Sequence, residues 1–534
     1  MVRRVAVIGA GVGGLASIKC CLDEGLEPTC FERSEDIGGL WRYTDSMDGG
    51  RISVYRSVIT NTSKEMSCFS DFPCPEDFPS FLPHGLLLEY FRMYSRHFDL
   101  LRHIRFRVTL SVRKRPDFAT SGQWEVVTET NGIRESHVFD AVMVCTGHFQ
   151  EPYLPLAFFP GKPCLSTREY KDAEAFRGKR VLVVGIGNTG GDLSVELSRV
   201  AAKVFLSARS NTWVVSRVSD HGFPFDMVNT TRFNHFLDWF LPSAITKRIR
   251  FRKFNSWFNH ANYGLASTKS SNFKIIVNEE LPFCLLSGTV VLKPKVRKFT
   301  ESSAVFEDGT TEENIDVVLF ATGYSFSFAF LEESVRSLFD DNRSLYKRIF
   351  PPQLEKPTLA IIGLVQLTGS VMVGAEMQAR WVTGIFAGWN KLPPTSKMMA
   401  DVLKKKNPSE RENLKLSFIS YTDEIASCAG IKPSVLRLLL TDPRLALAIF
   451  FGPCTPYQYR LVGRGKWSGA RDAILTQWQR TLKPLRTRVV DDSSDGSDGW
   501  CWMCLLALPV ALTAAFLLSR HPWPGWSPRA GPQL

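Results

Sequence analysis

Two short apolar runs along the chain each lead into a glycine-rich segment and then into a stretch with helical character. Val5–Ile8 and Val181–Val184 are typical of buried strands, and they lie 176 residues apart. A strand, a tight glycine turn and a helix in this order let the backbone approach a pyrophosphate at the helix N-terminus. The pattern therefore predicts two dinucleotide sites. Their candidate cofactor-binding residues are Gly9, Ala10, Gly11, Val12, Gly13 and Gly14 in the first turn, and Gly185, Gly187 and Gly190 in the second.

A second apolar repeat has the same spacing. Asp140–Gly147 and Asp316–Gly323 each consist of an acidic residue, an apolar run and a turn of small residues, again 176 residues apart. Such runs are typical of buried parallel strands, whose ends form the ligand crevice of an open α/β sheet. We therefore predict an α/β protein with two Rossmann-like dinucleotide-binding domains.

The residues that follow each turn indicate different nucleotides. Glu32, 18 residues past Gly14, ends the predicted second strand of the first domain. A carboxylate there accepts hydrogen bonds from ribose hydroxyls and repels a 2′-phosphate. Ser207 and Arg209 follow the second turn, and an arginine pairs with a 2′-phosphate in a forked geometry. The pattern favours FAD in the first domain and NADPH in the second, with ordinary solvated charges as the alternative for Glu32 and Arg209.

Composition divides the chain further. Prolines mark a linker between the two domains, and an aromatic and basic stretch interrupts the second. That stretch is typical of a segment that rests on a membrane or lines the substrate entry, or else of a solvated helical face. The predicted order is an FAD-binding domain (1–148), a linker (149–177), an NADP-binding domain (178–320) with a helical insertion (213–278), a return to the FAD domain (321–445), a C-terminal segment (446–499) and a transmembrane helix (500–518).

The C-terminal run at 500–518 carries no charge and is long enough to cross a bilayer as a helix, with a buried core helix as the alternative. The basic residues Lys483, Arg486 and Arg488 before it favour a cytosolic body. No secretory signal precedes the first strand, and the 12 cysteines show no framework spacing, so we expect reduced thiols. The net charge of +12 suits anionic cofactors or an acidic membrane face, and no nucleic-acid-binding motif is present.

The residue pattern favours chemistry that needs no protein nucleophile. The Cys-x-x-Cys spacing of disulfide reductases occurs at Cys501 and Cys504, inside the hydrophobic tail, where it cannot serve a flavin. No convincing metal cluster is present, and we predict no metal site. Passing hydride to oxygen, and then oxygen to a substrate, requires the protein to bind, orient and exclude water.

Further motifs resemble those of the flavin-containing monooxygenases of the vertebrate, microsomal type. They are Glu27–Ser34, Gly38–Arg42, Thr60–Met66, Phe320–Tyr324 and Phe451–Cys454, and the likeness covers nearly the whole chain. The resemblance implies FAD contacts at Gly9–Gly13, Glu32, Leu40, Trp41 and Thr62. It implies NADP contacts at Thr60, Asn61, Thr189, Gly190, Gly191 and Asp192.

The resemblance also implies a function. In such enzymes a flavin C4a-hydroperoxide, formed with NADPH and O2, oxygenates soft nitrogen or sulfur nucleophiles of small xenobiotic or metabolic substrates; some members oxygenate ketones in a Baeyer–Villiger reaction. Asn61 is the candidate catalytic residue, because a neutral amide can hydrogen-bond the peroxide or cofactor without offering a proton that expels hydrogen peroxide. A local Asx turn is the alternative. The implied location is the endoplasmic reticulum membrane with the body facing the cytosol, and the oligomeric state stays open, a homo-oligomer included.

The chain departs from the family pattern in the linker. The motif Phe-x-Gly-x-x-x-His-x-x-x-Tyr begins at Phe159 and Gly161, but Leu165 stands where histidine belongs and Tyr170 comes one residue late. Aligned on Tyr170, the histidine position holds Ser166. Because the linker precedes the NADP-binding domain, its shortening can disturb NADP docking. An uncoupled NADPH oxidase, or a catalytically silent membrane-anchored flavoprotein, is therefore the alternative function.

Overall fold

The computed structural model describes residues 2–45, 52–154, 164–266, 274–338, 344–405 and 416–488. The chain forms two units, Met1–Pro484 and Leu485–Leu534, and the elements below belong to the first. The predicted transmembrane helix at 500–518 lies outside the described residues. Within the described ranges, no helix has both the length and the apolar character needed to span a bilayer.

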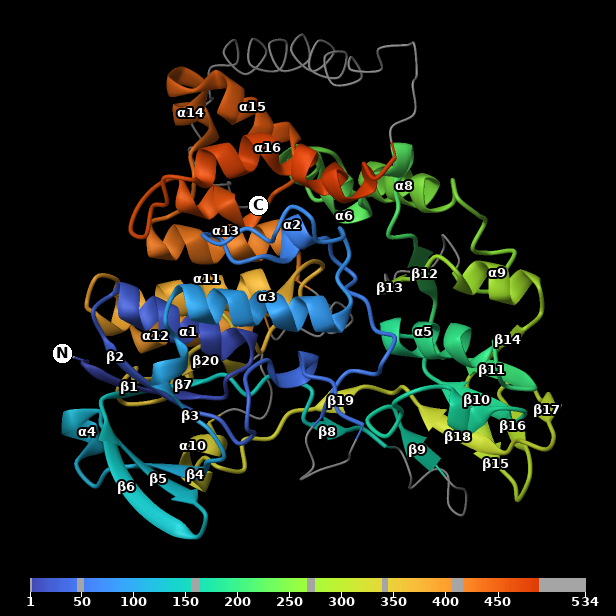
Figure 1. The fold of residues 1–534 in the computed structure, drawn as a ribbon, viewed down its shortest axis with the longest axis horizontal. Helices are drawn as coiled ribbons and strands as arrows, with labels where there is room; N and C mark the ends of the chain where they lie inside the picture. The colour runs from blue at the N-terminus through green and yellow to red at the C-terminus, as the bar shows by residue number, and fades with distance from the viewer. Residues whose placement is uncertain are drawn as a thin grey trace, which may run out of the picture. The chain divides into compact units, whose positions relative to one another are not determined.

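The first glycine turn belongs to a parallel five-stranded sheet (Figure 1). Its strands, in spatial order, are β20 (Leu359–Ile361), β7 (Ala141–Val144), β1 (Arg4–Ile8), β2 (Glu27–Phe31) and β3 (Ile104–Arg105). Since β20 comes from a distant part of the chain, the polypeptide returns to this sheet after building the second. The predicted strands around residues 5–8, 28–32 and 141–144 are present.

A second parallel sheet of five strands carries the second glycine turn. Its order is β14 (Val290–Lys293), β11 (Lys203–Ser207), β10 (Arg180–Val184), β18 (Val317–Phe320) and β9 (Cys164–Ser166). The acidic residue of each apolar repeat binds the neighbouring strand: the Asp140 carboxylate accepts from the backbone N–H of Arg4, at 3.0 Å, and Asp316 from that of Arg180, at 2.7 Å. The repeat seen in the sequence is therefore a repeat of strand pairing.

Both central strands face two different cores, because successive side chains of a strand point to opposite faces. In β1, Val5 and Val7 join the core under the helices, whereas Ala6 and Ile8 join a core shared with an antiparallel sheet. The helices are α1 (Val12–Asp23), α11 (Val371–Phe386) and α13 (Phe418–Ala429). Both α1 and α13 pack on α11. Figure 1 shows α1 and α11 beside the first sheet. The antiparallel sheet consists of β4 (Thr109–Lys114), β5 (Trp124–Thr130) and β6 (Ile133–Phe139).

The second sheet is covered by α5 (Asn188–Leu197) and α9 (Leu281–Leu286), with a small antiparallel sheet of β15 (Val296–Phe299), β16 (Ala304–Phe306) and β17 (Thr311–Glu312). The insertion contains β12 (Thr212–Val215), α6 (Phe225–Asn229), α7 (Arg232–Phe240), α8 (Ser243–Phe254) and β13 (Lys274–Val277). The remaining elements include α2 (Lys64–Ser67), α3 (His84–His97), α4 (Phe118–Ser121), α10 (Glu333–Arg336), α12 (Thr395–Lys405), α14 (Val435–Thr441), α15 (Pro443–Phe451), α16 (Ala470–Leu482) and the pair β8 (Glu151–Pro152) and β19 (Tyr324–Ser325).

The 3₁₀ helix η9 (Pro456–Arg460) ties distant parts of the chain together through four consecutive side chains. Their buried partners are Glu65 for Tyr457, Arg232 for Gln458, Asp423 for Tyr459, and Glu376 with Asp71 for Arg460. Arg480 of α16 reinforces the first of these contacts, since its Nη2 lies 2.6 Å from Oε2 of the fully buried Glu65. Buried charges must be paired to be tolerated, so these contacts fix α2, α7, α11 and α13 around η9.

Replacing Arg480 by methionine is expected to lower the free energy of unfolding by roughly 3–5 kcal/mol, because it leaves the Glu65 carboxylate buried without its cation. Urea unfolding of the holoenzyme measures the loss. The matched control is Arg471→Met, whose ion pair with Asp442 is partly exposed and should therefore contribute little to stability. Equal losses in the two variants would contradict the structural role given to the Glu65 pair.

Candidate functional site

The first glycine turn closes tightly between β1 and α1. Gly9 has a φ of +100°, a conformation that side chains other than glycine rarely adopt. A Cβ on Gly14 would lie 1.9 Å from the Gly9 carbonyl oxygen, so the helix can approach the strand only with glycine at that position. Gly11 is the N-cap residue of α1 and supplies no side-chain acceptor. The first N–H groups of α1 therefore remain available to an anionic ligand.

Glu32 lies against this turn. Its Oε2 accepts a hydrogen bond from the backbone N–H of Ala10 at 2.7 Å, and its Oε1 accepts from the N–H and hydroxyl of Ser34, each at 2.8 Å. A carboxylate has about four lone-pair sites, so capacity remains for a ribose hydroxyl. The glycine turn therefore holds in place the Glu32 side chain that is predicted to contact the ribose.

Leu40 and Trp41 form the 3₁₀ helix η1 (Gly39–Trp41), which lies beside the same turn. The N–H of Gly38 donates to the Ala10 carbonyl at 3.1 Å, and the Cα of Gly39 would lie 3.7 Å from a Cβ on Gly11. Three of the four segments of the predicted FAD site meet here, namely Gly9–Gly14, Glu32 and η1, whereas the contact of Thr62 with FAD stays a prediction. Thr62 itself exchanges a hydrogen bond with Ser67.

The second glycine turn repeats the geometry of the first. Gly185 has a φ of +112°, and a Cβ on Gly190 would lie 1.9 Å from the Gly185 carbonyl oxygen. Gly187 is the N-cap residue of α5, and a Cβ there would meet no described atom within 4 Å. The turn leaves open space at the helix N-terminus, as a dinucleotide requires. After the first glycine turn, Val12 and Gly13 are the first two residues of α1. After the second, Thr189 and Gly191 lie within the first four residues of α5.

The other predicted NADP contacts have structural partners of their own. The Asp192 carboxylate accepts from the Tyr55 hydroxyl at 2.7 Å and from Asn278 Nδ2 at 2.8 Å, and burial raises its pKa. The buried Ser207 hydroxyl donates to the Pro294 carbonyl at 2.9 Å. This bond uses the only hydrogen that the hydroxyl could donate to a phosphate oxygen. Arg209 is exposed at the end of β11. Binding of the 2′-phosphate by Arg209 stays a prediction, and Ser207 is less suited to it than the sequence indicates.

The candidate catalytic residue, Asn61, is held by an arginine of the insertion. Nη2 of Arg217 donates to Asn61 Oδ1 at 2.8 Å, and Nε of Arg217 donates to the Thr60 carbonyl at 3.2 Å. Nη1 of Arg217 pairs with Glu279 at 2.9 Å. Since a guanidinium can only donate, this contact fixes the amide with its oxygen toward Arg217. The Asn61 N–H₂ group is thereby left as the free donor.

Asp226 holds the other end of the same loop. Its Oδ2 accepts from the backbone N–H of Ser63 at 2.7 Å and from the Ser63 hydroxyl at 3.0 Å. Burial raises the pKa of Asp226 to about 6, so the carboxylate is mostly ionised at neutral pH. On the opposite side, Thr60 Oγ1 accepts from the Leu82 N–H at 2.9 Å. The Thr60–Ser63 loop is therefore fixed from both directions.

Arg217, Asp226 and Glu279 were missed by the sequence analysis. Arg217 and Asp226 lie in the stretch 213–278, which was interpreted as membrane-facing, as lining the substrate entry or as a solvated helical face, and Glu279 directly follows it. No local spacing distinguishes these three residues from other charged side chains. A weak signal was available: Arg217 lies two residues after the buried strand β12, and ligand crevices form where such strands end.

The altered linker reaches the same region. Its residues 155–163, including Phe159 and Gly161, lie outside the described residues, but Leu165 and Ser166 form the edge strand β9 of the second sheet. Tyr170 is buried and meets Tyr55 edge to face, with ring centroids 6.0 Å apart. Since Tyr55 donates to Asp192, the linker is connected to α5 by two packed tyrosines.

The chain matches known proteins over nearly its whole length. Residues 2–520 match the family described as Flavin-binding monooxygenase-like. Dimethylaniline monooxygenase (N-oxide-forming) 4 of Mus musculus is 55% identical over 532 residues, which cover 97% of this chain and 95% of the relative. Dimethylaniline monooxygenase (N-oxide-forming) 2 of Macaca mulatta is 54% identical over 509 residues, covering 93% and 95%.

Solved structures share the fold at lower identity. S-allyl-L-cysteine S-oxygenase from Allium sativum is 24% identical with a TM-score of 0.61, covering 90% of this chain and 99% of that protein. Cyclohexanone monooxygenase from Rhodococcus sp. Phi1 is 16% identical with a TM-score of 0.55, covering 80% and 98%. Together with the two glycine turns and the family match, these similarities determine the assignment. The chain belongs to the flavin-binding monooxygenase-like family, and it is a flavin-dependent monooxygenase that uses FAD and NADPH.

Proposed function

We propose that this enzyme uses NADPH and O2 to oxygenate soft nitrogen nucleophiles, and sulfur nucleophiles of similar reactivity, in small molecules. The relatives at 54–55% identity are named for N-oxide formation from dimethylaniline, and this supports nitrogen as the acceptor. The observation that carries the proposal is the Asn61 amide, whose orientation Arg217 fixes, in a chain that has two glycine turns of the dinucleotide-binding type. Ketone oxygenation finds support only in distant structures, whose likeness is limited to the fold.

The chain's own residues prepare the site in three ways. The Gly9–Gly14 turn, Glu32 and η1 would hold FAD, and the Gly185–Gly190 turn with Arg209 would hold NADPH. Bound FAD, reduced by NADPH, supplies the oxygen-transferring chemistry. Arg217 holds the oxygen of the Asn61 amide, so its N–H₂ group would be available to donate a hydrogen bond to bound FAD without releasing a proton. Asp226 and Leu82 keep the loop that carries Asn61 from moving.

We further propose that the enzyme sits in the endoplasmic reticulum membrane, anchored by residues 500–518 with its body in the cytosol. The uncharged run supports the anchor, and the nine buried or half-buried cysteines among the described residues are free thiols, as suits a reducing compartment. Exposed aromatic and aliphatic side chains on α7 and α8 support a second contact with the lipid surface. They are Trp239, Phe240, Ile245 and Ile249, with 47–79% of their surface exposed.

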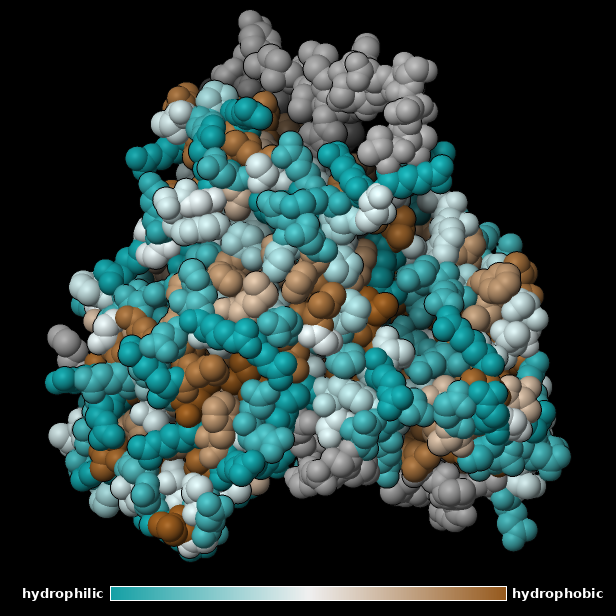
Figure 2. Space-filling model, viewed as in Figure 1, coloured by the Kyte–Doolittle hydropathy of each residue, from teal (hydrophilic) through white to brown (hydrophobic). Residues whose placement is uncertain are grey.

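Charge supports the same surface. Lys247, Arg248 and Arg252 are exposed on α8, the helix that also exposes Ile245 and Ile249. A helix that exposes both apolar and basic side chains binds anionic headgroups and buries its apolar face at the interface. Figure 2 shows further hydrophobic residues at the surface over α14 and α15, two helices that pack near α7. A solvated helical face remains the alternative that the experiment below decides.

Replacing Asn61 by aspartate is expected to keep flavin bound while N-oxide formation falls about 100-fold, because the carboxylate still accepts from Arg217 but no longer offers an N–H. The measurements are bound flavin, N-oxide formed from dimethylaniline and hydrogen peroxide released per NADPH. Asn314→Asp, the same change at an exposed loop position, is the control. Unchanged N-oxide formation in Asn61→Asp would remove Asn61 from the mechanism.

The unmodified enzyme tests the alternative raised by its short linker. If Tyr170 and Tyr55 still position α5, N-oxide formation should account for most of the NADPH consumed, since NADP docking is intact. The stoichiometry of NADPH, N-oxide and peroxide measures this. Peroxide without N-oxide would instead identify an uncoupled oxidase, and a preparation without flavin would identify a catalytically silent protein.

Ending the chain at residue 488 is expected to remove the anchor but leave weak, salt-sensitive binding to vesicles that contain anionic lipid. Adding Trp239→Ser and Ile249→Ser should weaken that residual binding at least about tenfold, because both apolar side chains leave the interface. Co-sedimentation with vesicles measures it. The control pair is Ile133→Ser and Leu286→Ser, which are also exposed but lie outside α7 and α8. An equal effect of the two pairs would refute the α7–α8 contact.

A further inference from the structure

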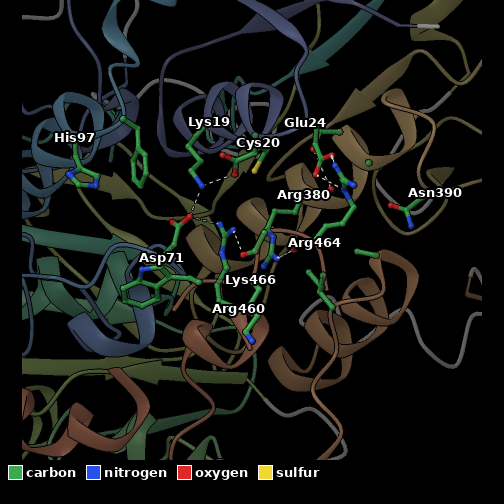
Figure 3. Close-up of a pocket in the computed structure, with 18 residues that line it drawn as sticks. Lys19, Cys20, Glu24, Asp71, His97, Arg380, Asn390, Arg460, Arg464 and Lys466 are labelled. Atoms are coloured by element: carbon green, nitrogen blue, oxygen red, sulfur yellow. Dashed lines mark hydrogen bonds and ion pairs between the residues drawn. The ribbon is translucent and has the colours of Figure 1, made fainter. Parts of the chain in front are cut away.

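A cavity of about 660 Å³ lies at the C-terminal end of α1. Its walls come from α1, α11, the end of α3, and the loop that follows η9 (Figure 3). Because α1 has 12 residues, its two ends are about 18 Å apart. The cavity is therefore separate from the glycine turn at the N-terminal end of the helix, and no cofactor prediction involves it.

Eight charged side chains line the cavity. The cations are Lys19, Arg380, Arg460, Arg464 and Lys466, and the carboxylates are Asp23, Glu24 and Asp71. All three carboxylates are already paired: Asp23 and Asp71 with Lys19, Asp71 also with Arg460, and Glu24 with Arg464. Figure 3 shows these pairs to either side of Arg380. Glu376 of α11 also pairs with Arg460, so the five cations face four carboxylates and one positive charge remains in excess.

Arg380 and Lys466 carry this excess. Nη1 and Nη2 of Arg380 donate to the carbonyls of Tyr459 and Arg464, at 2.9 and 3.0 Å. Among the described residues, no carboxylate lies within 4.0 Å of the Arg380 guanidinium or of the exposed Lys466 ammonium. Burial, and then the neighbouring Arg460, lower the pKa of Arg380 to about 10. The carboxylates of Glu376 and Asp71 oppose this shift, but neither lies within 4.0 Å of the guanidinium.

Helix C-termini do not supply that counter-charge. Several helices end at the cavity, and their terminal carbonyls would make the site negative if they were unpaired. In α1 the Cys20 carbonyl accepts from the N–H of Glu24, and in α11 the Gly384 carbonyl accepts from the N–H groups of Trp389 and Asn390. In α13 the Ala426 carbonyl accepts from the N–H of Ile431. The helix ends are closed by their own backbone.

We propose that the cavity binds a small anionic molecule through carboxylate or phosphate oxygens, with Arg380 and Lys466 as its counter-charges. The planar guanidinium offers paired donors to such oxygens, and the flexible ammonium adds a point charge. The volume lies within the range of small-molecule sites. The anion supplies the missing charge beside Arg380 and binds independently of NADPH. This site does not depend on the substrate proposed above.

The experiment uses the full-length holoenzyme with saturating NADP⁺, in an Arg209→Gln background that removes the predicted 2′-phosphate partner. Inorganic phosphate and citrate are titrated separately at constant ionic strength, and binding is followed by calorimetry and by the thermal midpoint. The expected result is saturable binding of at least one probe. Phosphate alone indicates a phosphate ligand, and citrate alone a carboxylate ligand. Absence of saturable binding by both probes overturns the proposal.

Lys466→Gln removes an exposed charge and should leave the fold unchanged, yet weaken binding of the probe about tenfold, as expected for a lost charge-assisted contact. Arg380→Gln should weaken it further, while Lys298→Gln, an exposed lysine on β15, should have no effect. Should Arg380→Gln fail to fold, Lys466→Gln alone decides. Binding that survives in Lys466→Gln at its original strength shows that the anion lies elsewhere.

Discussion

Steric closure of the two glycine turns is the constraint on which this structure depends. In each turn the helix approaches the strand end so closely that a Cβ would lie 1.9 Å from a carbonyl oxygen. No side chain can be accommodated at that distance, and the approach brings the helix N-terminus to the edge of a parallel sheet. The result is a donor-rich crevice that suits a pyrophosphate. Because the same closure occurs in both sheets, one backbone solution serves FAD and NADPH alike.

The insertion of the second nucleotide-binding region contacts a loop of the first. Arg217 follows a strand of the insertion and reaches the Thr60–Asn61 segment, while Asp226, a few residues later, reaches Ser63. A segment that interrupts the second nucleotide-binding region therefore fixes the loop that carries the candidate catalytic amide. The same insertion exposes apolar and basic side chains on α7 and α8. The proposed positioning of Asn61 and the proposed membrane contact thus involve one piece of chain.

Buried charge organises the rest of the body. Along η9, consecutive side chains engage Glu65, Arg232, Asp423 and Glu376, so that four helices are held around a single short segment. Where pairing is complete, as at Glu65 and Arg480, the charges fix the fold. At Arg380, which has no carboxylate within 4.0 Å among the described residues, a cavity adjoins the cation. The same chemistry therefore accounts for both a rigid centre and a candidate ligand site.

The sequence by itself determined the strands, both glycine turns, the acidic end of β2 and the family resemblance, because each of these signals is local. Apolar runs, glycine spacing and strand-end residues act within about 30 residues, the length of one strand–helix–strand unit. Only the tertiary structure decided that Arg217 binds Asn61, 156 residues away, and that Asp192 binds Tyr55, 137 residues away. It likewise decided that the Ser207 hydroxyl donates to the Pro294 carbonyl. It also decided that Arg380 lacks a carboxylate among the described residues. Such contacts depend on which segments the fold brings together, and a side chain's charge does not specify its distant partner.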